Sequence, residues 1–212
     1  MQKDANELPL RERKKLRTRE ALVDTALDLF TARDFTAVTL DEIVGAVEVS
    51  KRTFFRTFTS KEDVALAPEK ELWAAYSANI ASRHLTSEHL IGAYEGALFA
   101  ALEQMTDGWE RRFLASRSLA DRTPALAAHS LRHCSEVSAN VVRLVADQLA
   151  GRPPSPVELR LLLDLVLAAW NRAQQTWTSS DAAQRDRTAL VRHTHEAFAV
   201  IPSVAALAAR DH

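Results

Sequence analysis

Apolar residues recur at intervals of three and four along almost the whole chain, a spacing typical of helices that bury one face. Val23, Leu27 and Phe30 follow this spacing and predict a first helix over residues 12–33. The 212 residues include only 5 glycines, and no β-branched run is bounded by turn residues. We therefore predict an all-α fold, in which the 47% of apolar residues supply the core.

Two short helices are predicted directly after the first one. Thr39 is a candidate N-cap, because Glu42 three residues later completes a capping box. Ser50 is a second candidate N-cap, and it opens a helix in which Phe54 and Phe58 share one face. Two amphipathic helices of about two turns each, joined by a short turn, are typical of a helix-turn-helix.

Basic residues flank this pair of helices, although the formal net charge of the chain is only −1. The run that precedes the pair contains one acid, Glu12, among Arg11, Arg13, Lys14, Lys15, Arg17 and Arg19. The run over residues 50–61 has no acid and contains Lys51, Arg52, Arg56 and Lys61. DNA binding requires a basic face rather than a basic protein, so this pattern favours DNA binding over a merely solvated surface.

Caps and prolines predict the later helices. Ser60, with Asp63 three residues on, opens a predicted long helix over 60–83 that contains Pro68 near its first turns. Thr123 followed by Pro124 is a specific helix start, and residues 151–156 form the clearest break. Further helices are predicted over 86–105, 109–120, 123–150, 155–178 and 184–200, and Pro202 interrupts the last helix.

The segment 15–65 resembles the N-terminal region of TetR-family transcriptional regulators. The matching stretches are RTREALVDTALDLF at 17–30, TLDEIV at 39–44, VSKRTFFR at 49–56 and SKED at 60–63. The resemblance implies about nine helices, with an N-terminal helix-turn-helix domain of three helices and a larger helical domain for ligand binding and dimerisation. We place DNA binding in residues 1–60, and effector binding and dimerisation in residues 61–212.

A few positions depart from the family pattern. Asp34 and Glu48 stand where glycines commonly end the first helix and form the turn. A left-handed backbone at a residue other than glycine costs about 1–2 kcal/mol. Phe55 stands where a phosphate-contacting tyrosine is common, and Thr57 where histidine or tyrosine is common. These departures are expected to affect DNA affinity more than the fold.

The resemblance places the third helix in the major groove of DNA. Arg52 is the first candidate for base readout, because arginine can pair with O6 and N7 of guanine together, and Lys51 and Thr53 lie beside it. The predicted phosphate contacts come from Thr39, Ser50, Thr57 and Lys61. Phe55 completes the candidate set, although packing is the simpler interpretation of its ring. The basic run at 11–19 is expected to follow the DNA backbone or to enter the minor groove.

Large apolar side chains beyond residue 60 are suited to the walls of a ligand pocket, although each aromatic ring is more often core than pocket. The candidate ligand-binding residues are Trp109, Phe113, Arg117, Trp170 and Trp177. Arg112 or Arg117 would anchor an anionic head such as a carboxylate or the phosphate of an acyl-CoA. A hydrophobic or acyl-CoA-like effector is therefore predicted.

Segments 157–177 and 184–200 are predicted to form the dimer interface. The apolar stripe assigned to it consists of Leu159, Leu162, Leu163, Val166, Leu167 and Trp170. Two such helices from each subunit would make a four-helix bundle, and a two-fold dimer would read a palindromic operator. The expected protein is a cytoplasmic homodimer that represses transcription on double-stranded DNA and is released by a small molecule.

Two alternatives stay open. His129 and His133, with Glu136 nearby, have a spacing that suits a metal-responsive regulator. The other alternative is a ligand-independent DNA-binding or architectural protein, which a fully packed second domain would favour and a sizeable apolar cavity would disfavour.

An enzyme is not expected. The sequence contains no nucleophile elbow, glycine-rich phosphate loop or HExxH motif, so no catalytic residue, metal ligand or cofactor is assigned. Cys134 is the single cysteine, which excludes an intrachain disulfide and fits a reducing compartment. No apolar run approaches the roughly 18–20 residues of a membrane span, so no membrane association is expected.

Overall fold

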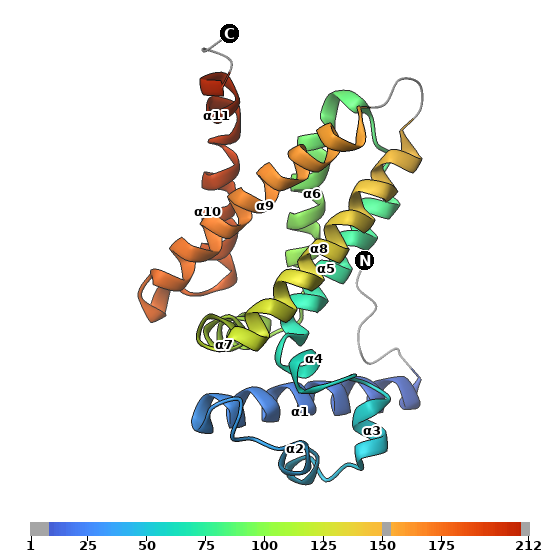
Figure 1. Cartoon of the computed structure of the whole chain (residues 1–212), viewed down its shortest axis with the longest axis vertical. Helices are drawn as coiled ribbons and strands as arrows, with labels where there is room; N and C mark the ends of the chain where they lie inside the picture. The colour runs from blue at the N-terminus through green and yellow to red at the C-terminus, as the bar shows by residue number, and fades with distance from the viewer. Residues whose placement is uncertain (1–8, 150–153, 209–212) are drawn as a thin grey trace. The chain divides into compact units, whose positions relative to one another are not determined.

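The computed structural model describes residues 9–149 and 154–208, which form helices and connecting turns without a strand (Figure 1). The predicted all-α fold is confirmed. The α-helices are α1 (Leu10–Arg33), α2 (Leu40–Ala46), α3 (Lys51–Phe55), α4 (Lys61–Ala65), α5 (Ala67–Ser82), α6 (Leu90–Glu103), α7 (Trp109–Arg122), α8 (Pro124–Gln148), α9 (Pro156–Ser179), α10 (Arg187–Phe198) and α11 (Ile201–Ala208). The predicted break at 151–156 lies partly outside the described residues, and none of the described helices is long and apolar enough to cross a membrane.

The chain packs as two compact units. Within the described ranges, the first unit comprises residues 9–71 and 106–133, and the second comprises residues 72–105 and 134–208. The division after residue 60 concerns the roles of the two regions rather than their packing, and it stays a prediction.

Local capping determines where the first short helices begin. The Thr39 hydroxyl accepts a hydrogen bond from the Glu42 amide at 3.3 Å, and the Glu42 carboxylate accepts one from the Thr39 amide at 2.7 Å. The Ser50 hydroxyl caps α3 by accepting from the Thr53 amide at 3.2 Å. These contacts satisfy backbone donors that a helix leaves unpaired, and they confirm both predicted caps.

The predicted helix over 60–83 is wrong in one respect, because the chain forms two helices there. α4 ends at Ala65, and Leu66 has φ −99° and ψ 10° before α5 begins. Pro68 has no N–H to donate to the carbonyl of Val64, and its ring would crowd that carbonyl, so a single helix cannot continue. Pro68 instead lies in the first turn of α5, where no such donor is needed. Pro202 similarly lies at the start of α11.

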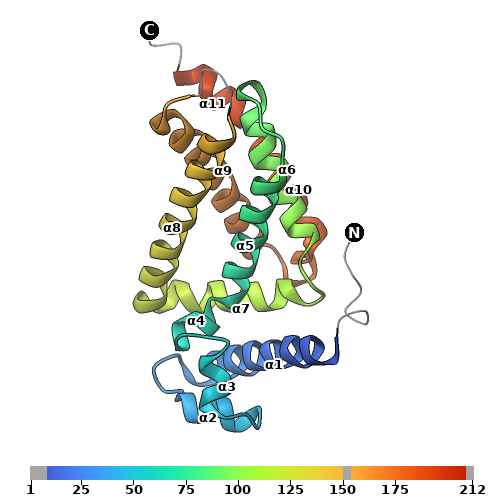
Figure 2. The ribbon, with the colours of Figure 1, turned by 90° about the vertical axis from the view of Figure 1, so that its right-hand side faces the viewer.

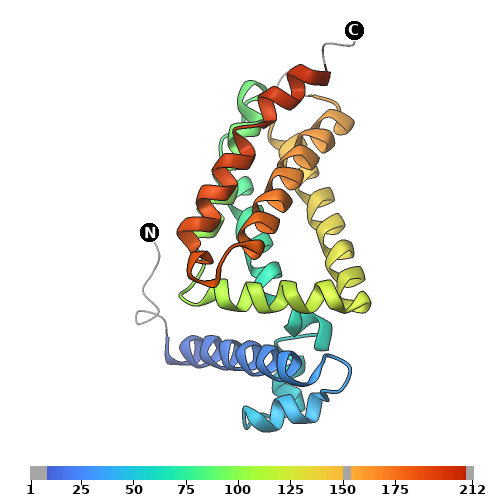
Figure 3. The ribbon, with the colours of Figure 1, turned by 90° about the vertical axis from the view of Figure 1, so that its left-hand side faces the viewer.

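The core of the first unit joins the helix-turn-helix to α1, α4 and α7. Leu22, Ala26 and Phe30 of α1 are buried, and Figure 3 shows α7 running alongside α1. Phe54 and Phe58 are also buried and have ring centroids 5.6 Å apart. The apolar side of α3 is therefore held inside this unit, which leaves its other side available to a partner.

In the second unit, α9 packs against α10 (Figure 1), and this packing corrects the predicted dimer stripe. Leu159, Leu163, Val166 and Trp170 are each no more than 2% exposed within the single chain, so they form its core. The error arose because a helix with apolar residues on two faces offers two stripes, and the sequence does not distinguish them.

Within residues 9–149 and 154–208, two residues other than glycine have positive φ. Asp34, directly after α1, has φ 73° and ψ 148°, a region that side chains rarely enter. Glu48 has φ 55°, and the Val49 amide donates to the Val44 carbonyl at 2.9 Å, as at a left-handed helix end that favours glycine. The strain of a left-handed backbone at a residue other than glycine, which the sequence raised for Glu48, is therefore present.

Replacing Glu48 with glycine should raise the free energy of unfolding by up to about 1 kcal/mol, because the strain of the left-handed backbone exceeds the added entropy of the unfolded chain. The measurement is thermal denaturation of both proteins. Glu48→Gln is the matched control, since it removes the charge and keeps the Cβ atom. An equal gain in both variants would assign the effect to charge instead of backbone strain.

Candidate DNA-binding surface

The outer side of α3 forms the first part of the candidate DNA-binding surface. Phe54 points into the core with no exposed area, whereas Lys51, Arg52, Phe55 and Arg56 are exposed. The helix is only five residues long, and the Ser50 cap and the Phe54 anchor hold its two ends. A short basic helix presented in this way has the geometry of a major-groove reader.

Arg52 and Lys51 differ in their surroundings. The Lys51 ammonium lies 2.8 Å from the Asp41 carboxylate, an exposed ion pair between α3 and α2. Arg52 is exposed, and the described part of the chain offers its guanidinium no ion pair or hydrogen bond. Its position in the first turn of α3 also matches the end of a recognition helix that faces bases.

The interpretation of Phe55 as a packing residue is wrong. Its side chain is 55% exposed, and its ring meets that of Phe54 edge to face, with ring centroids 5.5 Å apart. An exposed ring on this face is suited to apolar contact with a thymine methyl group. Phe55 therefore lies with Arg52 rather than with the core.

The predicted hydroxyl contacts divide into two groups. Thr39 and Ser50 are exposed N-cap residues, so they can cap a helix and still face a phosphate. Thr53 and Thr57 are half-buried, and the Thr57 hydroxyl donates to the Thr53 carbonyl at 3.3 Å. Contact of these four hydroxyls with DNA stays a prediction.

Lys61 has a structural environment that the sequence did not indicate. Its ammonium donates to the carbonyls of Phe35 at 3.0 Å and Val38 at 2.5 Å. It also lies 4.6 Å from the centre of the Phe35 ring and 5.9 Å from that of Phe30. These contacts tie the start of α4 to the loop between α1 and α2.

Arg56, which belongs to the second basic run but is not among the individual DNA contacts predicted from the sequence, joins that run to α1. Together with the first turns of α1, it lines a surface hollow formed by Leu10, Arg11, Lys14, Lys15, Thr18 and Arg56. The two basic runs, about forty residues apart in sequence, thus meet on one surface. Arg56 is the C-cap residue of α3, so it lies on the same short helix as Arg52.

Glu42 links α2 to α1 and carries a pH dependence. The hydrogen bond from the Thr39 amide, and next the Arg33 guanidinium at 2.5 Å, lower the pKa of Glu42 from its ordinary value near 4.5 to about 2. A carboxylate whose pKa falls on folding stabilises the fold above its unfolded pKa and loses that contribution as the pH falls. The contribution of Glu42 is therefore full above about pH 4.5 and disappears towards pH 2.

Glu42→Gln should lower the thermal midpoint at neutral pH and flatten its decline between pH 4.5 and 2. The measurement is the midpoint across this range for both proteins. Glu12→Gln, at an exposed position in the first turn of α1, is the control. Parallel pH curves for wild type and Glu42→Gln would contradict the assignment.

The predicted effector residues are divided between the two units. In the first unit, Trp109 stacks on Phe113 with centroids 4.6 Å apart and donates its indole N–H to the Pro68 carbonyl at 3.0 Å. In the second, Trp177 is buried and donates to the Asp186 carbonyl at 3.0 Å, and Trp170 is buried against Trp73. These rings contribute to the two cores, and their role in ligand binding stays a prediction.

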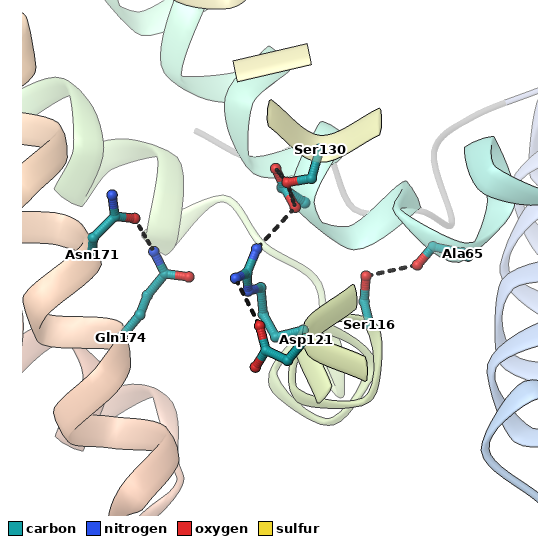
Figure 4. A network of polar contacts seen from close by, with 8 residues as sticks. Ala65, Ser116, Asp121, Ser130, Asn171 and Gln174 are labelled. Atoms are coloured by element: carbon teal, nitrogen blue, oxygen red, sulfur yellow. Dashed lines mark hydrogen bonds and ion pairs between the residues drawn. The ribbon is translucent and has the colours of Figure 1, made fainter. Parts of the chain in front are cut away.

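Arg117 belongs to a polar network in the first unit (Figure 4). It lies 3.6 Å from the buried carboxylate of Glu69 and 3.3 Å from Asp121. Both oxygens of Glu69 accept from the Ser130 hydroxyl, at 2.7 and 2.9 Å. The guanidinium thus compensates a buried charge, which is a structural role that the sequence did not indicate.

The histidines proposed as metal ligands also have other contacts. His129 Nε2 lies 3.3 Å from the Lys70 ammonium, whose charge would oppose a cation. No group of three or more histidine, cysteine or acidic side chains is arranged to hold a metal ion in the ranges that the structure describes. Neither observation favours the metal-responsive alternative.

Comparison with known proteins finds a family model that matches the residues of this surface. Residues 22–67, from α1 to the start of α5, match the model of the bacterial regulatory proteins of the tetR family. The HTH-type transcriptional regulator TcmR of Streptomyces glaucescens is 39% identical over 142 residues, which cover 65% of this chain and 62% of TcmR. The match therefore spans less than two thirds of that relative.

A crystal structure of a TetR-family transcriptional regulator from Mesorhizobium loti covers 90% of this chain and 97% of its own, with 16% identity and a TM-score of 0.48. The family model over residues 22–67 is the finding that bears on the surface, because it contains α2, α3 and the caps that position them.

Proposed function

We propose that this chain is a sequence-specific transcriptional regulator that binds double-stranded DNA, because its residues 22–67 match the model of the bacterial regulatory proteins of the tetR family and the regulator TcmR is 39% identical to it over 142 residues. The observation that carries the proposal is the outer side of α3, where Arg52 is exposed and without a partner among the described residues. Basic residues of α1 and Arg56 supply the sequence-independent attraction to phosphates. Repression, the usual mode in the family, is the proposed outcome.

Binding to a palindromic operator requires two copies of the chain. The buried stripe of α9 is unavailable, but Val157 and Leu161 on the same helix are 67% and 60% exposed and lie one turn apart. We place the homodimer interface on this outer side of α9. A two-fold dimer then presents two copies of α3 to two half-sites.

Leu161→Glu should convert the dimer to a monomer, because it places a charge in an apolar contact, and operator affinity should fall with it. The measurements are sedimentation velocity and gel shift. Leu131→Glu is the matched control, since Leu131 is an equally unprotected leucine, 72% exposed, on α8. A Leu161→Glu protein that remains dimeric would place the interface elsewhere.

The proposed function includes release from DNA by a small hydrophobic or acyl-CoA-like molecule. A ligand releases DNA only if it prefers one conformation of the protein over another. One interior cavity lined by described residues, beside Trp73, has a volume of about 10 Å³, which is the size of a single water molecule. Unpaired polar groups of the second unit, among them the hydroxyl of Tyr76 beside this cavity, support a ligand.

The deciding experiment is a gel shift of the purified chain with the intergenic DNA upstream of its own gene, at two salt concentrations and with excess non-specific competitor. A salt-sensitive shift that resists the competitor and footprints on a palindrome is the expected result. Failure to find such a site by selection from random DNA would overturn the proposal.

A further inference from the structure

Two tyrosine hydroxyls in the second unit are buried without hydrogen-bond partners. Tyr76 of α5 is 1% exposed, Tyr94 of α6 has no exposed area, and neither hydroxyl has a hydrogen-bond partner among the described residues. Buried tyrosine hydroxyls are almost always paired, because an unpaired one loses its hydration without compensation. Two unpaired tyrosine hydroxyls buried in one unit are therefore unusual.

A third unpaired polar atom belongs to Arg83, just after the end of α5. Its Nε is buried without a hydrogen-bond partner. Its guanidinium lies against Gly96 of α6, where an added Cβ atom would come within 3.2 Å of it. Gly96 therefore makes room for the guanidinium between α5 and α6, which lie side by side (Figure 2).

Tyr76 is affected electrostatically by both of the other groups. Burial raises the pKa of Tyr76, the neighbouring Tyr94 raises it further, and the Arg83 charge opposes this rise. Burial also raises the pKa of Tyr94 to about 12. Both hydroxyls therefore stay protonated at neutral pH and remain hydrogen-bond donors.

We propose that Tyr76, Tyr94 and Arg83 form the polar end of an effector site that binds the carboxylate of a hydrophobic organic acid. All three groups donate hydrogen bonds, and the guanidinium adds a positive charge, so a carboxylate, which only accepts hydrogen bonds, matches the chemistry of each of them. This inference rests on the proposed function as a ligand-responsive regulator, and it moves the site to α5 and α6.

The apolar end of the site adjoins Tyr76. The small cavity beside this ring is lined by Trp73, Tyr76, Cys134, Val137, Ser138, Val141, Leu163 and Leu167. Its volume of about 10 Å³ corresponds to a single water molecule, so an organic acid enters only if the side chains of α5, α8 and α9 move apart. Such a ligand prefers the opened conformation, which is the requirement for an effector.

The test is calorimetric titration of the full chain with 2-naphthoate, with 2-naphthamide as a neutral probe of the same shape. We expect 2-naphthoate to bind at least about 10-fold more tightly than the amide, because only the acid satisfies the charge. Tyr76→Phe, Tyr94→Phe and Arg83→Gln should each weaken binding of 2-naphthoate by about 10-fold.

Stability provides a second readout. Without ligand, Tyr76→Phe and Tyr94→Phe should leave the thermal midpoint unchanged or raise it, because each removes an unpaired hydroxyl. Ser116→Ala is the control and should lower it, since this buried hydroxyl donates to the Ala65 carbonyl at 2.6 Å. Lower midpoints for both tyrosine variants would indicate a structural water between the hydroxyls and would overturn the proposal.

Failure of 2-naphthoate to bind at millimolar concentration, or equal binding of the acid and the amide, would also overturn it. The titration contains no DNA, so its result is independent of operator binding. A regulator that shifts its operator but does not bind 2-naphthoate loses only the proposed effector site. A chain that binds 2-naphthoate in this pattern but no operator retains the site and loses the proposed function.

Discussion

Arg52→Ala should weaken binding to the operator by roughly 5- to 150-fold, which corresponds to about 1–3 kcal/mol. It should also relax the preference for one base in each half-site, because a bidentate contact with guanine is lost. The effect is expected to be large because Arg52 is exposed on α3 and has no competing partner among the described residues. It should leave the thermal midpoint unchanged, since no contact within the chain is broken.

The measurement is a competition gel shift against operators substituted at each position. Arg56→Ala is the matched control, because Arg56 lies at the end of the same helix within the basic hollow. It should weaken all sequences alike and reduce the dependence of affinity on salt by about one charge. An unchanged base preference in Arg52→Ala would transfer base readout to another residue.

Lys61→Ala should lower the free energy of unfolding of the first unit by about 1–3 kcal/mol, because two carbonyls lose a charged donor. Those carbonyls belong to Phe35 and Val38, and the loss of the ammonium above the Phe35 ring adds to the effect. The sequence-based prediction was different: a phosphate contact, whose loss lowers the salt dependence of DNA binding by about one charge.

The two roles of Lys61 can be separated by two measurements on the same variant. A lower midpoint with an unchanged salt dependence would assign Lys61 to the fold alone, and a changed salt dependence would add a phosphate contact. Lys51→Ala is the matched control, because Lys51 is exposed and paired only with Asp41 on the surface. An unchanged midpoint in Lys61→Ala would contradict the structural role.

The beginnings of the helices could be predicted because capping is local. Thr39 and Glu42, or Ser50 and Thr53, lie within one turn of each other, so the sequence contains all the partners of each contact. The break at Leu66 was local as well, but Pro68 is tolerated in a first turn and forbidden further on. Whether Pro68 breaks a helix therefore depends on where that helix begins, and the sequence did not show that α5 begins at Ala67.

Contacts between residues far apart in the chain could not be predicted from the sequence. Lys61 finds its carbonyl partners 23 and 26 residues away, and the sequence does not show which polar groups a lysine will meet. Aromatic residues were selected for the effector site by size, but large rings fill cores as readily as pockets. The sequence could not show that the hydroxyls of Tyr76 and Tyr94 are unpaired, because this depends on the positions of all the polar groups around them.

The separation of α3 into an anchored side and an exposed side has a consequence for engineering. Phe54 and Phe58 secure the helix, whereas Arg52, Phe55 and Arg56 contribute almost nothing to the interior. Libraries randomised at the exposed positions should therefore yield folded proteins at high frequency. Such a scaffold would allow the operator preference to be exchanged while the effector response stays the same, so several orthogonal switches could be derived from one chain.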